Sequence, residues 1–270
     1  MESTAQARTN PHGEPVLSLR GISKGFGAVQ ALSGIDLDIY AGEVVAIVGD
    51  NGAGKSTLVK ILAGVHPADA GTISFQDRVV SIPSPAVSRE LGIATVFQDL
   101  ALCDNLDVVS NLFLGREIGT LALDEVEMEE RSWTLLRQLS AKIPSVRLAV
   151  ASLSGGQRQT VAIARSLIGD PTVVILDEPT AALGVAQTAE VLNLVERLRE
   201  RGLGVVLISH NMADVQAVAD RVVVLRLGRN NGEFLVSDVS YEEIIAAITG
   251  ATDNVVTRRA AGQNKEESKS

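Results

Sequence analysis

The sequence is short of the residues that stabilise small secreted domains. It has one cysteine, Cys103, in 270 residues, so no intramolecular disulfide can form, and this count fits a reducing compartment such as the cytosol. Aromatic residues make up only 3% of the chain, whereas hydrophobic residues make up 46%. A core must therefore be aliphatic, and there are enough Val, Ile, Leu and Ala residues for a sizeable one.

Basic residues and long apolar runs are also scarce. The chain has 24 Lys and Arg against 33 Asp and Glu, a formal net charge of -9. We therefore expect no nucleic-acid partner, because such partners need a basic face to meet phosphates. No run approaches the roughly 18 apolar residues of a membrane helix, and the polar N-terminus lacks the apolar stretch of a secretory signal. We expect a soluble protein that works at a membrane only if other chains supply the span.

The hydrophobic pattern predicts an α/β fold. Residues 43–49, "EVVAIVG", form a continuous apolar run, which is typical of a strand buried on both faces. After residue 170, apolar runs typical of strands alternate with helical periods, and this alternation indicates a parallel sheet with right-handed crossovers. Residues 104–168 show mainly helical periods instead. The polar tails, residues 1–15 and 251–270, are expected to be disordered.

The strongest motif is "GDNGAGKST", which fits G-x-x-x-x-G-K-[ST] between a predicted buried strand and a predicted helix. Its glycines let backbone N–H groups cradle phosphate oxygens, and the helix N-terminus adds its positive dipole end. The competing interpretation is a glycine-rich turn that binds nothing. The residues expected to bind nucleotide are Gly49, Asn51, Gly52, Ala53, Gly54, Lys55, Ser56 and Thr57.

Two adjacent acids stand at the end of the run "VVILDE". Asp177 and Glu178 follow a predicted buried parallel strand, where ligands of open α/β sheets bind. Unpaired carboxylates are costly there, and a Mg²⁺ ion and a water beside ATP would give both a role. Because successive side chains point oppositely, we expect Asp177 to assist the metal and Glu178 to polarise the attacking water. The competing interpretation is that the acids only cap a helix.

A third element is "LSGGQ", residues 153–157, which opens a predicted helix. Alone it is a common helix start. In the order phosphate loop, Gln98, LSGGQ, LDE and His210, however, the chain resembles the nucleotide-binding subunits of ABC transporters over about residues 16–250. The resemblance implies a RecA-like P-loop NTPase core with an antiparallel β subdomain and an inserted α-helical subdomain at about residues 99–168.

The resemblance also implies residue roles. Phe26 matches the aromatic residue that stacks on adenine, with an ordinary core phenylalanine as the alternative. Gln98 matches a glutamine that touches Mg²⁺ and joins the helical subdomain to the core, although a plain strand-end glutamine is possible. His210 matches the histidine that contacts the γ-phosphate. The catalytic set is then Glu178, His210 and Gln98, and the metal ligands are Ser56, Gln98 and Asp177; the cofactors are ATP and Mg²⁺.

In this family LSGGQ of one subunit covers the ATP of the other, so Ser154, Gly155, Gly156 and Gln157 imply a homodimer. The resemblance also implies transmembrane permease subunits, which dock on residues 99–117, although these residues could instead form an ordinary helical packing surface. It further implies an extracytoplasmic sugar-binding protein that acts indirectly. The protein would lie at the cytoplasmic face of the membrane as a peripheral subunit. The stretches "AVQALSGIDLDIYAGEVVAIVG" and "VVSNLFLGRE" resemble ATPases of monosaccharide importers such as those for ribose, xylose or fructose.

Other functions stay open at this stage. They are import of a non-sugar solute, a non-transport ABC ATPase of translation or DNA repair, and an ATP-binding regulator that does not hydrolyse. One residue departs from the family pattern: Gly184 stands where the family commonly has an aspartate that crosses to the partner subunit. Glycine has no side chain for that contact, so communication between the two sites is the part of the mechanism that the resemblance supports least.

Replacing the lysine of the phosphate loop tests this assignment. In Lys55→Ala the cationic contact with the β and γ phosphates is lost, so we expect weaker nucleotide binding, measured by calorimetry. Unchanged ATP affinity would show that the loop does not hold phosphates.

Overall fold

A six-stranded sheet forms the centre of the fold. The computed structural model describes residues 13–119 and 122–251, so the two predicted tails lie almost entirely outside the described residues. The strand order is β10–β9–β3–β8–β7–β6, with β10 antiparallel and all other neighbours parallel. The strands are β3 (Val44–Val48), β6 (Ile93–Val96), β7 (Val173–Asp177), β8 (Gly204–Ile208), β9 (Arg221–Arg226) and β10 (Arg229–Leu235).

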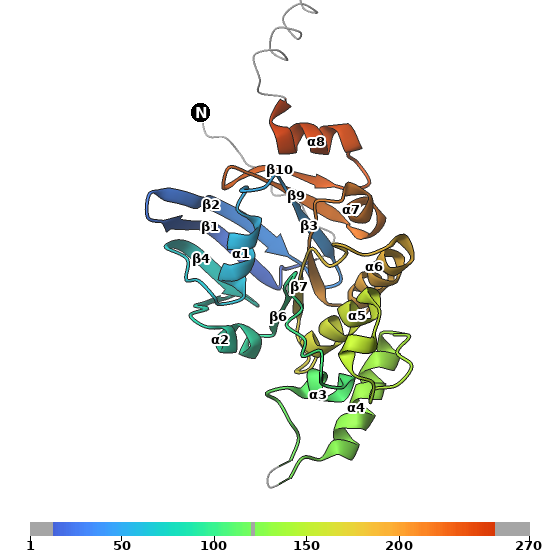
Figure 1. The fold of residues 1–270 in the computed structure, drawn as a ribbon. Helices are drawn as coiled ribbons and strands as arrows, with labels where there is room; N and C mark the ends of the chain where they lie inside the picture. The colour runs from blue at the N-terminus through green and yellow to red at the C-terminus, as the bar shows by residue number, and fades with distance from the viewer. Residues whose placement is uncertain (1–12, 120–121, 252–270) are drawn as a thin grey trace, which may run out of the picture.

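A second, antiparallel sheet and helix α1 cover one face of the central sheet (Figure 1). This smaller sheet has the order β2–β1–β4–β5. Its strands are β1 (Leu17–Phe26), β2 (Val29–Ile39), β4 (Ala70–Phe75) and β5 (Arg78–Val80), and α1 spans Lys55–Leu62. The short helix α2 (Pro85–Glu90) leads from this layer to β6.

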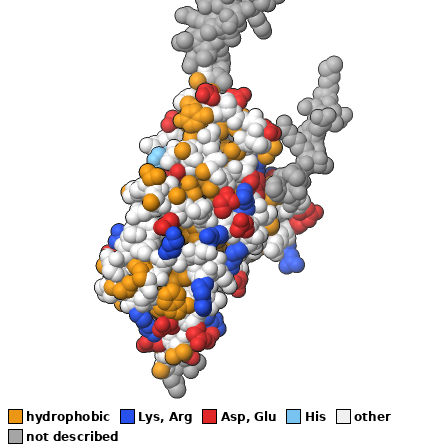
Figure 2. Space-filling view, turned by 90° about the vertical axis from the view of Figure 1, so that its right-hand side faces the viewer, with side chains coloured by type: hydrophobic (Ala, Val, Ile, Leu, Met, Phe, Trp, Pro, Cys, Tyr) orange, Lys and Arg blue, Asp and Glu red, His pale blue; other side chains and the backbone are white. Residues whose placement is uncertain are grey.

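The remaining helices cover the opposite face. They are α3 (Val108–Phe113), α4 (Glu125–Gln138), α5 (Gly155–Ser166), α6 (Val185–Glu200), α7 (Met212–Val218) and α8 (Tyr241–Thr249), with a 3₁₀ turn at Val150–Ser152. Among the residues described, no helix has the length and apolar character to cross a membrane. On the face shown in Figure 2, acidic and basic side chains are intermixed rather than gathered by sign.

The strict alternation of aliphatic side chains along the central strands divides the core into two clusters. Val45 and Ile47 of β3 face α1 and the antiparallel sheet, whereas Val44, Ala46 and Val48 face the helical layer. A period of two is the geometry of a pleated strand, so burial on both faces requires an unbroken apolar run. The apolar run at residues 43–49 therefore predicted this strand correctly.

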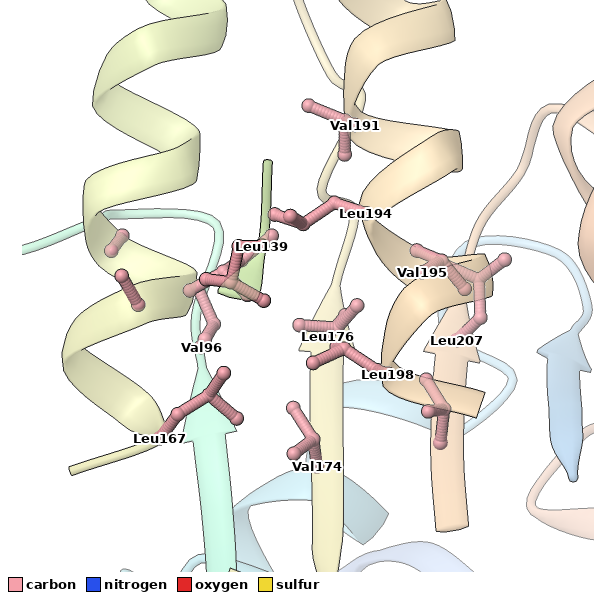
Figure 3. Packing of buried hydrophobic residues seen from close by; sticks show 14 of the residues in the cluster. Val96, Leu139, Leu167, Val174, Leu176, Val191, Leu194, Val195, Leu198 and Leu207 are labelled. Atoms are coloured by element: carbon pink, nitrogen blue, oxygen red, sulfur yellow. The ribbon is translucent and has the colours of Figure 1, made fainter. Parts of the chain in front are cut away.

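The helical insertion is anchored in the same core. Leu139, at the end of α4, lies among Val96 of β6 and Leu194 of α6 (Figure 3). Leu167, just after α5, and Leu176 of β7 belong to the same cluster and are almost fully buried. Protein interiors are close-packed, so the fit between side chains of the helical layer and the sheet stabilises their contact in addition to the burial of apolar surface.

A buried guanidinium ties the two sheets together. Arg221, at the start of β9, donates to both carboxylate oxygens of Glu43 at 2.8 and 2.9 Å. It also donates to Glu233 of β10 at 2.7 Å and to the carbonyl oxygen of Asp38 in β2 at 2.6 Å. Burial opposes the charge of Arg221, but the hydrogen bonds and charges of Glu43 and Glu233 outweigh it and raise its pKa. The side chain of Glu43 is equally buried, so each charge depends on the other.

The sequence pattern missed two elements. Helix α2 carries the pattern of an N-terminus, with Ser84 accepting from the Val87 N–H and Pro85 in the first turn, but it is too short to show a helical period. Strand β10 is polar and has a register shift between Asn230 and Gly232, which hides the period of two.

Removing Arg221 should destabilise the fold strongly. In Arg221→Ala the buried Glu43 loses its partner, and we expect the free energy of unfolding to fall by about 3–5 kcal/mol, measured by denaturant melts. The exposed Arg229 of β10 provides the control, since Arg229→Ala should change stability by less than about 0.5 kcal/mol. Equal effects of the two substitutions would contradict this role for the buried pair.

Candidate nucleotide site

Four loops that carry predicted site residues leave the same edge of the central sheet. In the parallel ladder Ile47 of β3 pairs with Ile208 of β8, which also pairs with Asp177 of β7. Val96 of β6 pairs with Leu176 of β7. The carboxyl ends of four strands are thus level, and the phosphate loop, Gln98, the acidic pair and His210 emerge at the edge where open α/β sheets bind ligands.

The backbone of the phosphate loop can be built only with glycine at two points. Gly49 has φ 151°, and a Cβ there would lie 2.1 Å from the carbonyl oxygen of Leu225. Gly54 has φ 103°, and its Cβ would lie 2.5 Å from Cδ2 of Leu32. Such approaches exclude any side chain. The loop therefore folds back tightly before α1 begins at Lys55, and α1 directs its N-terminal N–H groups toward it.

Lys55 is held over this loop. Its ammonium Nζ donates to the carbonyl oxygens of Gly49 at 2.6 Å and Asp50 at 3.1 Å. The cation thus lies inside the turn that would surround a phosphate. Ser56 is exposed at the start of α1 and Thr57 is partly buried.

Asp177 has the environment of a carboxylate that needs a cation. Burial, followed by the negative charge of Glu178, raises its pKa, while the charges of Lys55 and Lys60 oppose the rise. The Ser56 hydroxyl, the Gln98 amide and the Asp177 carboxylate offer the oxygen ligands that suit Mg²⁺. Among the residues described, no group of three or more His, Cys, Asp or Glu side chains is arranged so that it could hold a metal ion.

Glu178 and His210 contact each other directly. The Oε2 atom of Glu178 lies 2.7 Å from Nδ1 of His210, and the side chain of Glu178 is 16% exposed while that of His210 is 73% exposed. Glu178 has φ 50°, a left-handed conformation that costs energy in a non-glycine residue. Its backbone N–H donates to the carbonyl oxygen of Ile208 at 2.9 Å, which helps to hold this conformation. The carboxylate is thereby directed at the loop that carries His210.

A buried aspartate that the sequence reasoning missed joins these two loops. Asp214 of α7 is 4% exposed. It accepts from the Thr180 hydroxyl at 2.6 Å and from the side-chain amide of Asn211 at 3.0 Å. Thr180 lies just after Glu178, and Asn211 lies just after His210. Asp214 therefore holds the loop that carries Glu178 next to the loop that carries His210. The signal was present as an N-cap asparagine followed three residues later by an acid.

Phe26 lies at the end of β1 as an exposed ring. It is 45% exposed, and the His66 ring packs against it edge-on with the centroids 5.3 Å apart. The Lys24 ammonium lies 5.5 Å from the ring centroid and pairs with Asp69 at 2.6 Å. The ring is thus oriented by neighbours but has a free surface, unlike an ordinary core phenylalanine.

Residues 154–157 form a second helix start, on the opposite side of the sheet from α1. Ser154 and Gln157 make a capping box, in which each side chain accepts from the backbone N–H of the other at 3.3 and 2.9 Å. A Cβ on Gly156 would lie 3.1 Å from Cβ of Gln187, so the glycine permits close contact between α5 and α6. Between described residues no hydrogen bond links this segment to the phosphate loop. Helix α5 packs in the core cluster on one face of the central sheet, and α1 packs in the cluster on the other face.

The fold and this edge define a class of protein, the P-loop nucleotide-binding proteins with an α/β core, as the sequence predicted. The sequence pattern of the ABC transporter family matches residues 32–181. The xylose/arabinose import ATP-binding protein of Sulfolobus acidocaldarius is 44% identical over 235 residues, which cover 87% of this chain and 94% of that protein. The fructose import ATP-binding protein of Rhizobium meliloti is 44% identical over 249 residues, covering 89% and 96%.

Solved structures of ATP-binding cassettes have folds similar to that of this chain. An ATP-binding cassette of an ABC transporter in its ADP conformation has a TM-score of 0.76 and 27% identity, covering 92% of this chain and 99% of that chain. A dimeric cassette in a post-hydrolysis state bound to ADP and Pi has a TM-score of 0.69 and 26% identity, covering 82% and 98%. The chain therefore belongs to the ABC transporter family, as an ATP-binding cassette ATPase, which confirms the predicted family, fold class and activity.

Gly184 lies at a place where a side chain fits. It is the N-cap of α6 with φ -75° and ψ 162°, it offers no side-chain cap, and a Cβ there would meet nothing within 4 Å. The backbone is thus already in the conformation of a capping residue, and the first turn of α6 has no acid. The absence of an aspartate is not imposed by the fold.

Restoring the aspartate should stabilise the chain. Gly184→Asp adds a cap and a charge at the positive end of the α6 dipole, so we expect the free energy of unfolding to rise by about 0.5 kcal/mol, measured by denaturant melts. Gly184→Ala is the matched control, because alanine restricts the unfolded chain without capping the helix. If alanine stabilises as much as aspartate, capping is not the cause.

Proposed function

We propose that the chain hydrolyses Mg²⁺-ATP as a homodimer and thereby drives import of a monosaccharide through transmembrane permease subunits. The observation that carries this proposal is near full-length similarity to sugar import ATP-binding proteins, together with the convergence of Lys55, Asp177, Glu178 and His210 on one sheet edge. The chain would work as a peripheral subunit at the cytoplasmic face of the membrane, with an extracytoplasmic sugar-binding protein delivering the solute to the permease.

We propose a separate role for each residue of the nucleotide site. Lys55 and the N–H groups of the phosphate loop would bind the β and γ phosphates, and Phe26 would stack on the base. Ser56, Gln98 and Asp177 would hold Mg²⁺, which supplies charge neutralisation at the transferring phosphoryl group. Glu178 would orient the attacking water. His210, hydrogen-bonded to Glu178, would fix that carboxylate and contact the γ-phosphate.

A second copy of the chain is needed to complete the site. Ser154, Gly155, Gly156 and Gln157 lie at the start of helix α5, which packs on the opposite face of the central sheet from α1, and Ser154 is exposed. The N-terminus of α5 is an anion-binding end that the same chain's nucleotide does not reach. The dimeric cassette bound to ADP and Pi supports dimerisation. In the head-to-tail pair that we propose, each α5 covers its partner's ATP.

The proposal that the solute is a monosaccharide rests on the names of the similar proteins. The similar proteins include importers of xylose or arabinose and of fructose, while the ribose import ATP-binding protein of Clostridium perfringens is 38% identical and about twice as long, since this chain spans 48% of it. A pair of identical cassettes would here replace two cassettes in one chain. These relatives favour monosaccharide import over import of a non-sugar solute and over roles in translation, repair or regulation.

Replacing the proposed water-polarising acid tests the hydrolytic role. In Glu178→Gln the amide cannot take up a proton, so we expect turnover to fall about 100-fold or more while ATP binding persists and an ATP-bound dimer accumulates. Steady-state ATPase assays and size-exclusion chromatography with ATP measure both effects. The exposed Glu190 of α6 is the control, as Glu190→Gln should leave turnover unchanged. Wild-type turnover in Glu178→Gln would remove Glu178 from this role.

A further inference from the structure

The loop after β7, which carries Glu178, and the loop after β8, which carries His210, are joined at two points by side chains. The first is the 2.7 Å contact between Oε2 of Glu178 and Nδ1 of His210. The second is the Asp214 carboxylate, which accepts from the Thr180 hydroxyl at 2.6 Å and from the Asn211 amide at 3.0 Å. Only short stretches of backbone separate the two points, so the contact at one point constrains the other.

The Asp214 carboxylate uses a separate oxygen for each loop. Thr180 donates to Oδ2, and the Asn211 amide donates to Oδ1. An ionised carboxylate only accepts hydrogen bonds, so both donors must point toward it. Asp214 is 4% exposed, and among the described residues no lysine or arginine forms an ion pair with it. The two donors therefore stabilise the buried charge, together with the dipole of α7, in whose first turn the acid lies.

The backbone on both sides of His210 is fixed, whereas its side chain is largely exposed. Ser209 is fully buried, and its hydroxyl oxygen accepts from the Asn211 N–H at 3.0 Å. The side-chain oxygen of Asn211 accepts from the Ala213 N–H at 3.0 Å. The imidazole of His210 is held by its contact with Glu178, and its side chain is 73% exposed. The direction of the imidazole therefore depends on the separation of the two loops, which the Asp214 hydrogen bonds hold.

The loop that carries Glu178 needs this support because its backbone is strained there. Glu178 has φ 50°, a conformation that persists only where surrounding contacts enforce it. Its N–H donates to the carbonyl oxygen of Ile208, and its own carbonyl oxygen accepts from the Ala181 N–H at 3.1 Å. These bonds fix the backbone at Glu178 and form the turn after it. The bond from Thr180 to Asp214 then ties that turn to α7.

We propose that Asp214 is a positioning residue for ATP hydrolysis, which holds Glu178 and His210 at a fixed separation through Thr180 and Asn211. The proposal rests on the proposed function, because it assumes that Glu178 orients the attacking water. Small displacements of reacting groups lower rates strongly, so a residue that fixes two such groups affects turnover without touching the nucleotide. Nucleotide binding should depend on it little, because the phosphate loop lies between β3 and α1, away from α7 in the chain.

The split between kcat and KM tests this role. Asp214→Ala and Thr180→Val each remove the hydrogen bond between the two residues, so we expect kcat for ATP hydrolysis to fall about tenfold or more while KM changes by less than about twofold. In Asp214→Asn the new amide can still accept from Asn211 and donate to the Thr180 hydroxyl, so we expect this variant to recover most of the lost kcat. Equal losses in the alanine and asparagine variants would contradict positioning by hydrogen bonds.

A double substitution shows whether Asp214 acts through Glu178. Residues that act as a unit have effects that do not add. In the Glu178→Gln background, Asp214→Ala should therefore lower the remaining turnover by less than about twofold, measured in single-turnover assays with the protein in excess over ATP. A further tenfold loss in that background would show that Asp214 acts independently of Glu178 and would overturn the proposal.

The imidazole of His210 provides a measurement that needs no activity. The chain has three histidines, so the resonance of His210 in histidine-labelled protein can be assigned by comparison with His210→Gln. In the full-length chain without nucleotide, we expect Asp214→Ala and Thr180→Val to shift the Nδ1 resonance of His210 and Asp214→Asn to shift it less. An unchanged resonance in all three variants would overturn the proposal.

Ser88→Ala is the matched control, because it removes one buried hydroxyl away from the two loops. Ser88 of α2 is 2% exposed, and its hydroxyl donates to the carbonyl oxygen of Leu62 at 2.7 Å, at the end of α1 far from Lys55. At a temperature well below the lowest melting temperature, this variant should keep the wild-type kcat and the wild-type resonance of His210. A loss of kcat that follows melting temperature in all variants, Ser88→Ala included, would show a general effect of stability and overturn the proposal.

The proposed function fails by a different result. If the wild type does not hydrolyse ATP, the proposed function is wrong, whatever the resonance of His210 shows. If the wild type is active and Asp214→Ala is equally active, the ATPase proposal stands and the role of Asp214 is wrong.

Discussion

The level register of the parallel strands is the constraint on which the rest of the structure depends. Each strand contributes one loop to the same edge, and a shift of one residue in β7 would turn Asp177 toward the other face of the sheet. The register is specified because the strands are buried on both faces by different partners. Residues facing α1 cannot exchange with residues facing the helical layer without leaving both clusters poorly packed.

The same constraint explains which features the sequence could reveal. The phosphate loop and the acidic pair are local patterns that directly follow continuous apolar strands, so their place at the sheet edge could be predicted. The fold class followed from the alternation of strands and helices. Helix α2 was not predicted because it is too short to show a helical period. Strand β10 was not predicted because it is too polar and irregular to show a period of two.

Contacts between residues far apart in the chain could not be predicted from the sequence. Arg221 and Glu43 are separated by 178 positions, and each alone is an unremarkable surface-type residue in the sequence. The hydrogen bond between Thr180 and Asp214 likewise depends on two neighbouring strands delivering their loops side by side. Charge pairs of this kind become visible only when topology has placed the strands, because nothing in their local sequence marks them as buried.

Helix α5 connects two distant segments of the fold. Its last turn carries Arg165, which grips the carbonyl oxygens of Leu100 and Ala101, and its first turn follows Ser154. Ten residues of helix separate the ends by about 15 Å. A pivot of about 10° at the arginine would therefore sweep the serine through roughly 3 Å, the length of a hydrogen bond. In the proposed dimer, the arginine end of the helix lies beside the segment of one chain that carries Gln98, and the serine end faces the nucleotide of the other chain. A small rotation at either end would therefore change both places together.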